Sequence, residues 1–365
     1  MPDSRLHRLS ALGQSVWIDY LSRTLLHSGG LAQKMEEDAV TGVTSNPTIF
    51  QKAIAEGDAY DDQMRDLLEH EEDAKEIFVA LAGRDIGEAC DLMRRVWDEG
   101  KGLRGYVSME VDPTFAYDTD ATIAEARRFH GLIDKPNLYV KIPGTKEGLP
   151  AIEEMIAAGK SINVTLIFSI QRHREVMEAY IRGIERLVEA GGDPSGVASV
   201  ASYFVSRVDT EADKRLEGHP ELQGRLAVAN AKLAYQSWKE VFAGERWAAL
   251  AAKGASKQWC LWASTSTKNP AYRDVLYVED LIGPDTVNTM PEETIEAFQD
   301  HGEVAPTIEE GLDEARKVFE DVEAAGVSVD DVTRVLEEEG VRKFSDSFAE
   351  LLDGIRSKRG ELVNA

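Results

Sequence analysis

Cysteine is scarce in this sequence. Cys90 and Cys260 are the two thiols in 365 residues, and they stand far apart. Two cysteines at that separation exclude a disulfide framework and a cysteine-based zinc site, and the seven histidines are scattered singly. We therefore expect no structural metal.

Long apolar runs are missing as well. No uninterrupted apolar stretch reaches the roughly 18 residues that a membrane-spanning helix needs. The segment MPDSRLHRLS at the start lacks the apolar core of a secretory signal. These absences predict a cytosolic protein that does not span a membrane.

Positive charge is in short supply. Lysine and arginine number 41 against 66 aspartates and glutamates, which gives a net charge of −25. A field of that sign repels nucleic acid and anionic membrane surfaces, so we expect neither as a partner. It would also repel a phosphorylated metabolite, and such a ligand would have to be held by a few local cations.

Short apolar or β-branched runs, each closing on polar or turn residues, recur eight times along the chain. Helical patterns separate them, which predicts an α/β protein with a parallel sheet. Eight such units close a (β/α)8 TIM barrel, and an open doubly wound sheet is the alternative. The runs are SVWIDYL (15–21), AVTGVTSN (39–46), LRGYVSMEV (103–111), NLYVKIPG (137–144), SINVTLIF (161–168), VASVASYFV (197–205), QWCLWAST (258–265) and TVNTM (286–290).

The helical patterns between and after these runs add detail. An apolar stripe predicts a helix from about Ile170 to Ala190, and the capping-box spacing of Thr307 and Glu310 predicts another that starts there. Long connections predict additional helices inserted near 56–102 and 208–257, and closing helices after Val327. Because no linker-like stretch interrupts residues 1–365, we expect a single domain.

Polar residues occupy strand positions where a barrel interior usually carries aliphatic side chains. Residues two apart share a face of a strand, and barrel active sites lie where strands run into βα loops. Five consecutive predicted strands break the aliphatic pattern near their ends, which predicts a polar site there. The pairs that share a face are Trp17 with Asp19, Thr44 with Asn46, Ser108 with Glu110, Tyr139 with Lys141, and Asn163 with Thr165.

Lys141 is the most unusual of these residues, because burying an ammonium without a partner is costly. Desolvation among apolar neighbours favours the neutral amine, which can attack a carbonyl. Asp19 and Glu110 would supply the acid and base that such chemistry requires. Each residue also has a plainer interpretation: Lys141 could snorkel, or pair with either carboxylate. Asn46 could simply start a turn, and Thr165 could serve the strand.

Six segments, in the same order, resemble the transaldolase family, and the resemblance covers the chain from about residue 10 onward. The spacing and the inserted helices are most similar to the longer bacterial members. The segments are GVTSNPTIFQKAI (42–54), VSMEVDP (107–113), NLYVKIPGT (137–145), SINVTLIFS (161–169), ASYFVSRVD (201–209) and ASTSTKNP (263–270).

The resemblance implies roles for individual residues. Lys141 would form a Schiff base with the donor ketose, and Asp19 would be the acid–base for breaking and making the carbon–carbon bond. Glu110 would act through a water molecule held by Thr165. Asn46 and Asn163 would bind donor hydroxyls, with Thr44, Ser108 and Ser202 lining the pocket.

A phosphate-binding end is implied too. Arg207 matches the family's main phosphate-binding arginine, although a salt bridge to Asp209 is the alternative. Ser266 matches a second phosphate contact. Lys268 stands where other members carry arginine, and a lysine binds phosphate as a point charge without the bidentate fork.

The implied reaction moves a dihydroxyacetone unit from sedoheptulose 7-phosphate to glyceraldehyde 3-phosphate, without cofactor or metal. The partners would be small sugar phosphates, and the protein would be a monomer or homodimer. Three alternatives are a related aldolase that releases free dihydroxyacetone, a glycosidase that uses Asp19 and Glu110 as its carboxyl pair, and a non-catalytic sugar-phosphate sensor.

Overall fold

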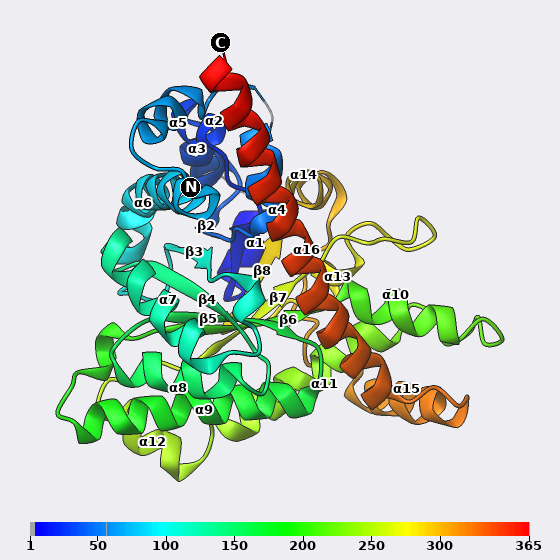
Figure 1. Cartoon of the computed structure of the whole chain (residues 1–365). Helices are drawn as coiled ribbons and strands as arrows, with labels where there is room; N and C mark the ends of the chain where they lie inside the picture. The colour runs from blue at the N-terminus through cyan, green and yellow to red at the C-terminus, as the bar shows by residue number, and fades with distance from the viewer. Residues whose placement is uncertain (1–3, 56, 365) are drawn as a thin grey trace.

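A closed barrel of parallel strands forms the centre of the protein. The computed structural model describes residues 4–55 and 57–364, and eight strands within them pair in chain order, with β1 also pairing with β8 to close the barrel (Figure 1). The predicted (β/α)8 barrel is confirmed, and the open sheet is excluded. The strands are β1 (Gln14–Ile18), β2 (Val40–Val43), β3 (Tyr106–Glu110), β4 (Leu138–Pro143), β5 (Ile162–Ile167), β6 (Ser199–Phe204), β7 (Trp259–Ala263) and β8 (Thr286–Met290).

Helices surround the barrel, and they also occupy both long connections where inserted helices are predicted. The helix predicted from Ile170 is present as α9. The helices are α1 (Arg5–Ala11), α2 (Arg23–His27), α3 (Gly30–Glu37), α4 (Pro47–Ala55), α5 (Asp61–Leu68), α6 (Ala74–Glu99), α7 (Thr119–Ile133), α8 (Gly148–Ala157), α9 (Ile170–Glu189), α10 (Ser206–Arg215), α11 (Leu226–Val241), α12 (Glu245–Ala251), α13 (Leu276–Glu279), α14 (Glu292–His301), α15 (Leu312–Ala324) and α16 (Val329–Asn364), with 3-10 turns η1 (Pro113–Phe115) and η2 (Pro194–Gly196).

Aromatic rings fill the barrel interior below the strand ends. Trp17 of β1 stacks on Tyr139 of β4 with 6.1 Å between ring centres, and Tyr106 of β3 stacks on Tyr139 at 3.9 Å. All three rings are buried. They lie on the inward faces that also carry Asp19, Glu110 and Lys141, so these polar residues stand above an apolar floor that excludes water.

Gly42 of β2 makes room for this floor. A Cβ atom at position 42 would lie 2.3 Å from the indole ring of Trp17, which is closer than any real contact. The large ring therefore depends on the absence of a side chain on the neighbouring strand.

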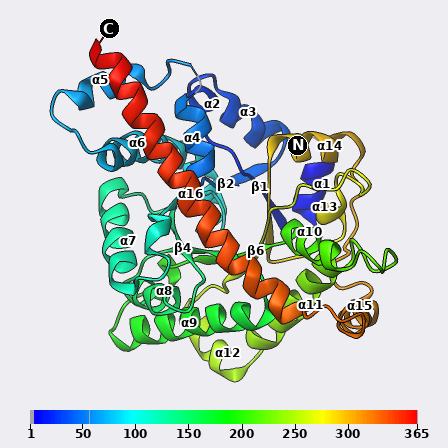
Figure 2. The same ribbon diagram turned by 45° about the vertical axis from the view of Figure 1, so that its right-hand side comes forward.

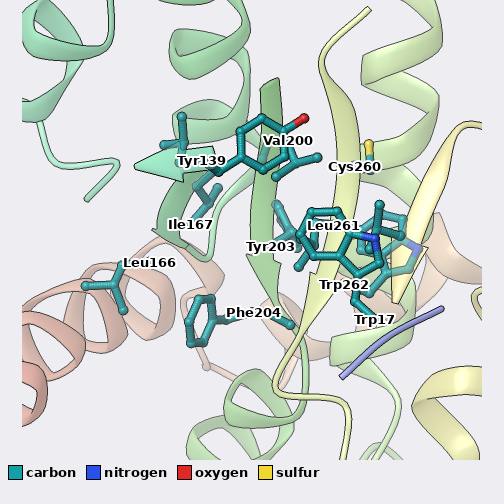
Figure 3. Packing of buried hydrophobic residues seen from close by; sticks show 14 of the residues in the cluster. Trp17, Tyr139, Leu166, Ile167, Val200, Tyr203, Phe204, Cys260, Leu261 and Trp262 are labelled. Atoms are coloured by element: carbon teal, nitrogen blue, oxygen red, sulfur yellow. The ribbon is translucent and has the colours of Figure 1, made fainter. Parts of the chain in front are cut away.

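A second aromatic layer packs outside the barrel. Tyr203 of β6 meets Trp262 of β7 edge to face, with 6.1 Å between ring centres (Figure 3). Tyr203 also meets His173 of α9 at 5.6 Å. These contacts fix α9 against the sheet, so the strand faces that point outward are as well packed as those that point inward.

Helix α16 runs across the end of the barrel at which the strands lead into the βα loops. In Figures 1 and 2 it passes in front of the strands, from near α15 toward α5. The Thr48 hydroxyl of α4 donates a hydrogen bond to Ser347 at 2.9 Å, and Arg172 of α9 forms an ion pair with Glu337. These contacts hold α16 over the strand ends.

The helix predicted to start at Thr307 instead begins at Leu312, after Gly311 with φ of 66°. The capping-box prediction is wrong, because Thr307 is used elsewhere. Its hydroxyl donates to the carbonyl of Glu279 and accepts the backbone N–H of Ile282 at 3.2 Å. The Thr307 side chain, which the local pattern assigns to a helix cap, therefore makes tertiary hydrogen bonds instead.

Candidate active site

The polar residues predicted from the strand ends converge at the mouth of the barrel. A cavity of about 350 Å³ opens there, beneath α16. Asp19 and Thr44 stand one position beyond β1 and β2, so the strands end slightly earlier than predicted. The predicted site residues that line this cavity are Asp19, Thr44, Asn46, Lys141, Thr165, Ser202, Arg207, Ser266 and Lys268.

Lys141 is held at the base of the site by two acceptors. Its Nζ donates a hydrogen bond to Glu110 Oε2 at 2.9 Å and another to the carbonyl of Ser45 at 3.0 Å. The side chain is 6% exposed, and that of Glu110 is 2% exposed. The idea of an isolated amine among apolar neighbours is therefore wrong, and the alternative pairing with Glu110 is confirmed.

Glu110 is a carboxyl group that can keep its proton. Burial raises its pKa, although the charge and the hydrogen bond of Lys141 act in the opposite direction. Burial therefore makes Glu110 better able to accept a proton beside the lysine. The pairing is compatible with nucleophilic chemistry for this reason.

Two buried oxygens near the lysine lack hydrogen-bond partners within the part of the chain that the structure describes. They are Glu110 Oε1 and Thr165 Oγ1. Buried polar atoms are almost always satisfied, and ordered water often provides the bond. Both atoms are therefore suited to hold water beside the lysine.

Asp19 is the second carboxyl group of the site. Its Oδ1 accepts the hydroxyl proton of Thr44 at 2.6 Å, and its backbone N–H donates to the carbonyl of Met290 at 2.8 Å. Burial raises the pKa of Asp19, while the Thr44 hydrogen bond and the charge of Lys141 lower it. A carboxyl group in this state can both accept and return a proton at the cavity wall.

Ser108 and Asn163 lie beneath the cavity and do not line it. Asn163 Nδ2 donates to Ser108 Oγ at 3.1 Å, and Ser202 Oγ donates to Asn163 Oδ1 at 2.7 Å. Both Ser108 and Asn163 are fully buried. These two hydrogen bonds therefore orient the side chain of Ser202, which does line the cavity.

Asn46 serves the local structure as well as the cavity wall. Its Oδ1 accepts the backbone N–H of Ile49 at 3.0 Å, and α4 begins directly after it at Pro47. The turn interpretation is confirmed by this bond, while the side chain also lines the cavity. Substrate binding by Asn46 stays a prediction.

The far side of the cavity carries two cations on neighbouring βα units. Arg207 lies in the first turn of α10 and has no carboxylate within 4.0 Å in residues 4–55 and 57–364, so the predicted alternative of a salt bridge to Asp209 is wrong. Lys268 follows β7, is exposed, and donates from Nζ to Ser266 Oγ at 2.6 Å. This end can receive an anion, because its charges are not neutralised locally.

Sequence reasoning did not single out several residues that line the cavity. The hydroxyls of Thr289 and Thr44 are hydrogen-bonded to each other at 2.6 Å. Thr289 is a polar residue near the end of β8, and this position could have identified it from the sequence. Phe344 reaches the cavity from α16, far away in the sequence, where no local pattern marks it. The others are Thr48, Ile49, Lys52, Phe204, Ala263, Ser264, Pro291 and Glu293.

The described residues contain neither a candidate metal cluster nor a membrane-spanning helix. Among those that the structure describes, no cluster of three or more histidine, cysteine, aspartate or glutamate side chains could hold a metal ion. Across the described helices, none has both the length and the apolar character needed to cross a bilayer.

A closed parallel barrel whose strand ends present a lysine paired with one carboxyl group, beside a second buried carboxyl group, is the arrangement of an enzyme of the (β/α)8 class. The model of one family, Transaldolase/Fructose-6-phosphate aldolase, matches residues 16–355. The chain belongs to that family.

Individual relatives agree with the family match. The chain is 52% identical over 361 residues to a transaldolase of Frankia alni, with 97% of each chain covered. It is 50% identical over 363 residues to transaldolase 1 of Streptomyces avermitilis, covering 98% of this chain and 96% of the relative. A transaldolase of Mycolicibacterium paratuberculosis is 50% identical over 362 residues, with 97% of each covered. The resemblance and the expected transaldolase, a transferase, are confirmed, and the aldolase alternative is not favoured.

Proposed function

We propose that this protein transfers a dihydroxyacetone unit from sedoheptulose 7-phosphate to glyceraldehyde 3-phosphate through a Schiff base on Lys141. The products would be erythrose 4-phosphate and fructose 6-phosphate, and the enzyme would act in the non-oxidative branch of the pentose phosphate pathway, in the cytosol. The observation that carries the proposal is the hydrogen bond between buried Lys141 and buried Glu110 at the base of a polar cavity.

The first step is attack of the Lys141 amine on the ketone of the donor. Transfer of the lysine proton to Glu110 would free the nitrogen lone pair, because the raised pKa of Glu110 makes it a competent acceptor. The resulting carbinolamine must then lose water, and this step needs an acid. A water molecule between Glu110 and Thr165 would relay the proton, which uses the two oxygens left without protein partners.

The second step is cleavage of the carbon–carbon bond. The iminium formed on Lys141 withdraws electrons from that bond once a base removes the proton of the neighbouring donor hydroxyl. Asp19 is the group for this role, because it lines the cavity and Thr44 fixes its orientation. The aldehyde product leaves, and the enamine stays on the lysine until the acceptor arrives. Asp19 then returns the proton as the new bond forms.

Binding would be divided between the two sides of the cavity. Thr44, Asn46 and Ser202 would contact donor hydroxyls, with Ser108 and Asn163 holding Ser202 from below. Arg207, Ser266 and Lys268 would bind the phosphate, and their charge offsets the repulsion expected from a net charge of −25.

The site also has the cover that a transferase needs. The enamine must be kept from water until the acceptor binds, and Phe204 and Phe344 line the cavity beside the lysine. The glycosidase alternative is less suited to this geometry. Its two carboxyl groups should flank a bound sugar, but Glu110 faces Lys141 and does not line the cavity.

Borohydride trapping tests the proposal directly. Incubation with fructose 6-phosphate followed by reduction should leave a three-carbon adduct on Lys141, located by peptide mass spectrometry. Lys141→Met is the matched control and should give no adduct. An unmodified Lys141 in the active wild-type protein would refute the Schiff base. Comparing transfer to erythrose 4-phosphate with release of free dihydroxyacetone then separates a transaldolase from the related aldolase.

A further inference from the structure

The two segments that carry the predicted phosphate contacts are joined at their bases. Arg207 lies at the start of α10, while Ser266 and Lys268 lie in the segment that follows β7. The backbone N–H of Ser206 donates to the carbonyl of Ser264 at 3.0 Å, and the two serine hydroxyls are 2.9 Å apart. This bond alone does not fix the direction in which α10 leaves the barrel.

A buried carboxyl group, that of Asp209, fixes that direction. Asp209 Oδ2 accepts the hydroxyl proton of Tyr277 at 2.8 Å, and its Oδ1 accepts the backbone N–H of Ala227 at 2.7 Å. Asp209 and Tyr277 are each 1% exposed. The Asp209 carboxyl group therefore ties α10 both to α13, which follows the Lys268 segment, and to the first turn of α11.

The same arrangement is repeated one helical turn further along α10. Asp213 Oδ2 accepts the hydroxyl proton of Tyr272 at 2.6 Å, and its Oδ1 accepts the backbone N–H of Gly224 at 2.9 Å. Residues four apart lie on one face of a helix, so one face of α10 carries both tyrosine–aspartate bonds. The inner bond, of Asp209, is the buried one and lies two residues from Arg207.

We propose that Asp209 and Tyr277 are positioning residues that hold Arg207 at the spacing from Ser266 and Lys268 that a single phosphate group requires. This inference rests on the proposed function, because it takes those three residues as the phosphate contacts. Arg207 has no ion pair of its own in the described residues, and its guanidinium lies 5.6 Å from the centre of the Phe204 ring on β6, so the orientation of α10 relative to β6 sets where the guanidinium points. Misplacing it weakens phosphate binding, while the chemistry on β4 continues.

Inorganic phosphate is the probe that needs no turnover. Tyr277→Phe should raise the Kd of the protein for phosphate about 5-fold, measured by calorimetry, because one positioned hydrogen bond is lost. Tyr60→Phe is the matched control. Its hydroxyl also donates to a buried carboxyl group, Asp85 Oδ2 of α6 at 2.8 Å, but Tyr60 stands just before α5, on the other side of the barrel. A wild-type Kd in Tyr277→Phe, or an equal rise in Tyr60→Phe, would overturn the proposal.

Substrate kinetics give a second readout. Tyr277→Phe should raise KM for fructose 6-phosphate with little change in kcat, and saturating substrate should still give the full yield of borohydride adduct. A matching loss with unphosphorylated fructose would point to general damage and would overturn positioning. Failure of the proposed function has a different signature, since the wild-type protein would then form no adduct, whatever its phosphate affinity.

A second variant covers the case in which Tyr277→Phe does not fold. Asp209→Asn keeps the volume of the side chain but cannot accept from both Tyr277 and Ala227 without presenting its own N–H groups to one of them. It should weaken phosphate binding in the same direction. A folded Asp209→Asn protein with wild-type phosphate affinity would also overturn the proposal.

Discussion

The ring of Phe344, on α16, lies with its centre 5.8 Å from the Nζ of Lys141 on β4. This distance is within the range of a cation–π contact, and it places an aromatic ring from outside the barrel over the Lys141 amine. The cover of the active site is therefore supplied by a helix that belongs to none of the strand-to-strand connections.

Removing this ring should change the fate of the enamine. Phe344→Ala should admit water to the lysine. We therefore expect the ratio between dihydroxyacetone released and dihydroxyacetone transferred to be roughly 5 times the wild-type ratio. Both products can be measured in one coupled assay. Leu351→Ala deletes another buried side chain from α16 and controls for loss of stability. An unchanged ratio would show that Phe344 does not shield the intermediate.

Replacing Lys141 should make the stability of the protein more dependent on the ionisation of buried Glu110. Lys141→Met should abolish turnover and remove the counter-charge, which raises the pKa of Glu110 further. A carboxyl group whose pKa is raised on folding stabilises the protein below its unfolded pKa, and that stabilisation is lost as pH rises through the folded value. The variant should therefore lose stability relative to wild type as pH rises above the ordinary glutamate range, because its folded state holds the Glu110 proton more tightly.

Denaturant unfolding at several pH values measures this effect. The double variant Lys141→Met with Glu110→Gln is the control, because a glutamine cannot ionise and should abolish the added pH dependence. If the single variant follows the wild-type profile, Glu110 does not depend on Lys141 for its charge balance.

Neutralising the second carboxyl group should separate the two chemical steps. Asp19→Asn keeps the shape of the side chain and an acceptor for Thr44, but it cannot take a proton. We expect kcat to fall by about 100-fold or more. Borohydride should then trap the whole six-carbon ketose phosphate on Lys141, because the bond is not cleaved. A three-carbon adduct formed at the wild-type rate would remove Asp19 from the acid–base role.

Arg207 and Lys268, the two cations of the proposed phosphate site, should contribute unequally to substrate binding. Arg207 is partly buried and can form a bidentate pair, so Arg207→Ala should raise KM for fructose 6-phosphate about 10-fold or more. Lys268 is exposed, and Lys268→Ala should raise KM by about 3-fold. Lys268→Arg tests whether the fork geometry strengthens binding. A larger effect of Lys268→Ala than of Arg207→Ala would reverse this assignment.

Asp209 should make stability depend on pH. Burial raises its pKa to about 7. The folded protein therefore holds this proton more tightly than the unfolded chain, and the stabilisation is lost as pH rises from about 4 through 7. Asp209→Asn removes this titration. Over that pH range, the unfolding free energy of the variant should therefore rise relative to that of wild type by about 1 kcal/mol or more. A difference that stays constant with pH would contradict the raised pKa.

The strands and much of the site could be predicted from the sequence because both produce local sequence patterns. Each strand is a short apolar run, and residues such as Asp19 and Lys141 stand out as polar groups near the ends of such runs. Their convergence then follows from barrel topology, which brings the ends of all parallel strands to one rim. Thr289 carried the same signal on β8 and could have been found in this way.

Other features depend on contacts between distant segments, for which no local pattern exists. Phe344 meets Lys141 because α16 crosses the barrel mouth. The sequence pattern of an amphipathic helix does not show which part of the protein that helix packs against. Thr307 has the spacing of a helix cap but bonds to Glu279 and Ile282. The pairing of Lys141 with Glu110 was one of several alternatives, and β3–β4 register decided among them by setting the two residues side by side.

The contact between Trp17 and Gly42 constrains how this barrel can change over evolutionary time. A side chain at position 42 cannot be accommodated while the indole is in place, so the route to a differently shaped barrel interior has a fixed order. A smaller residue at position 17 must come first, and a side chain at position 42 can follow. A barrel that keeps the tryptophan in this position must therefore keep the glycine.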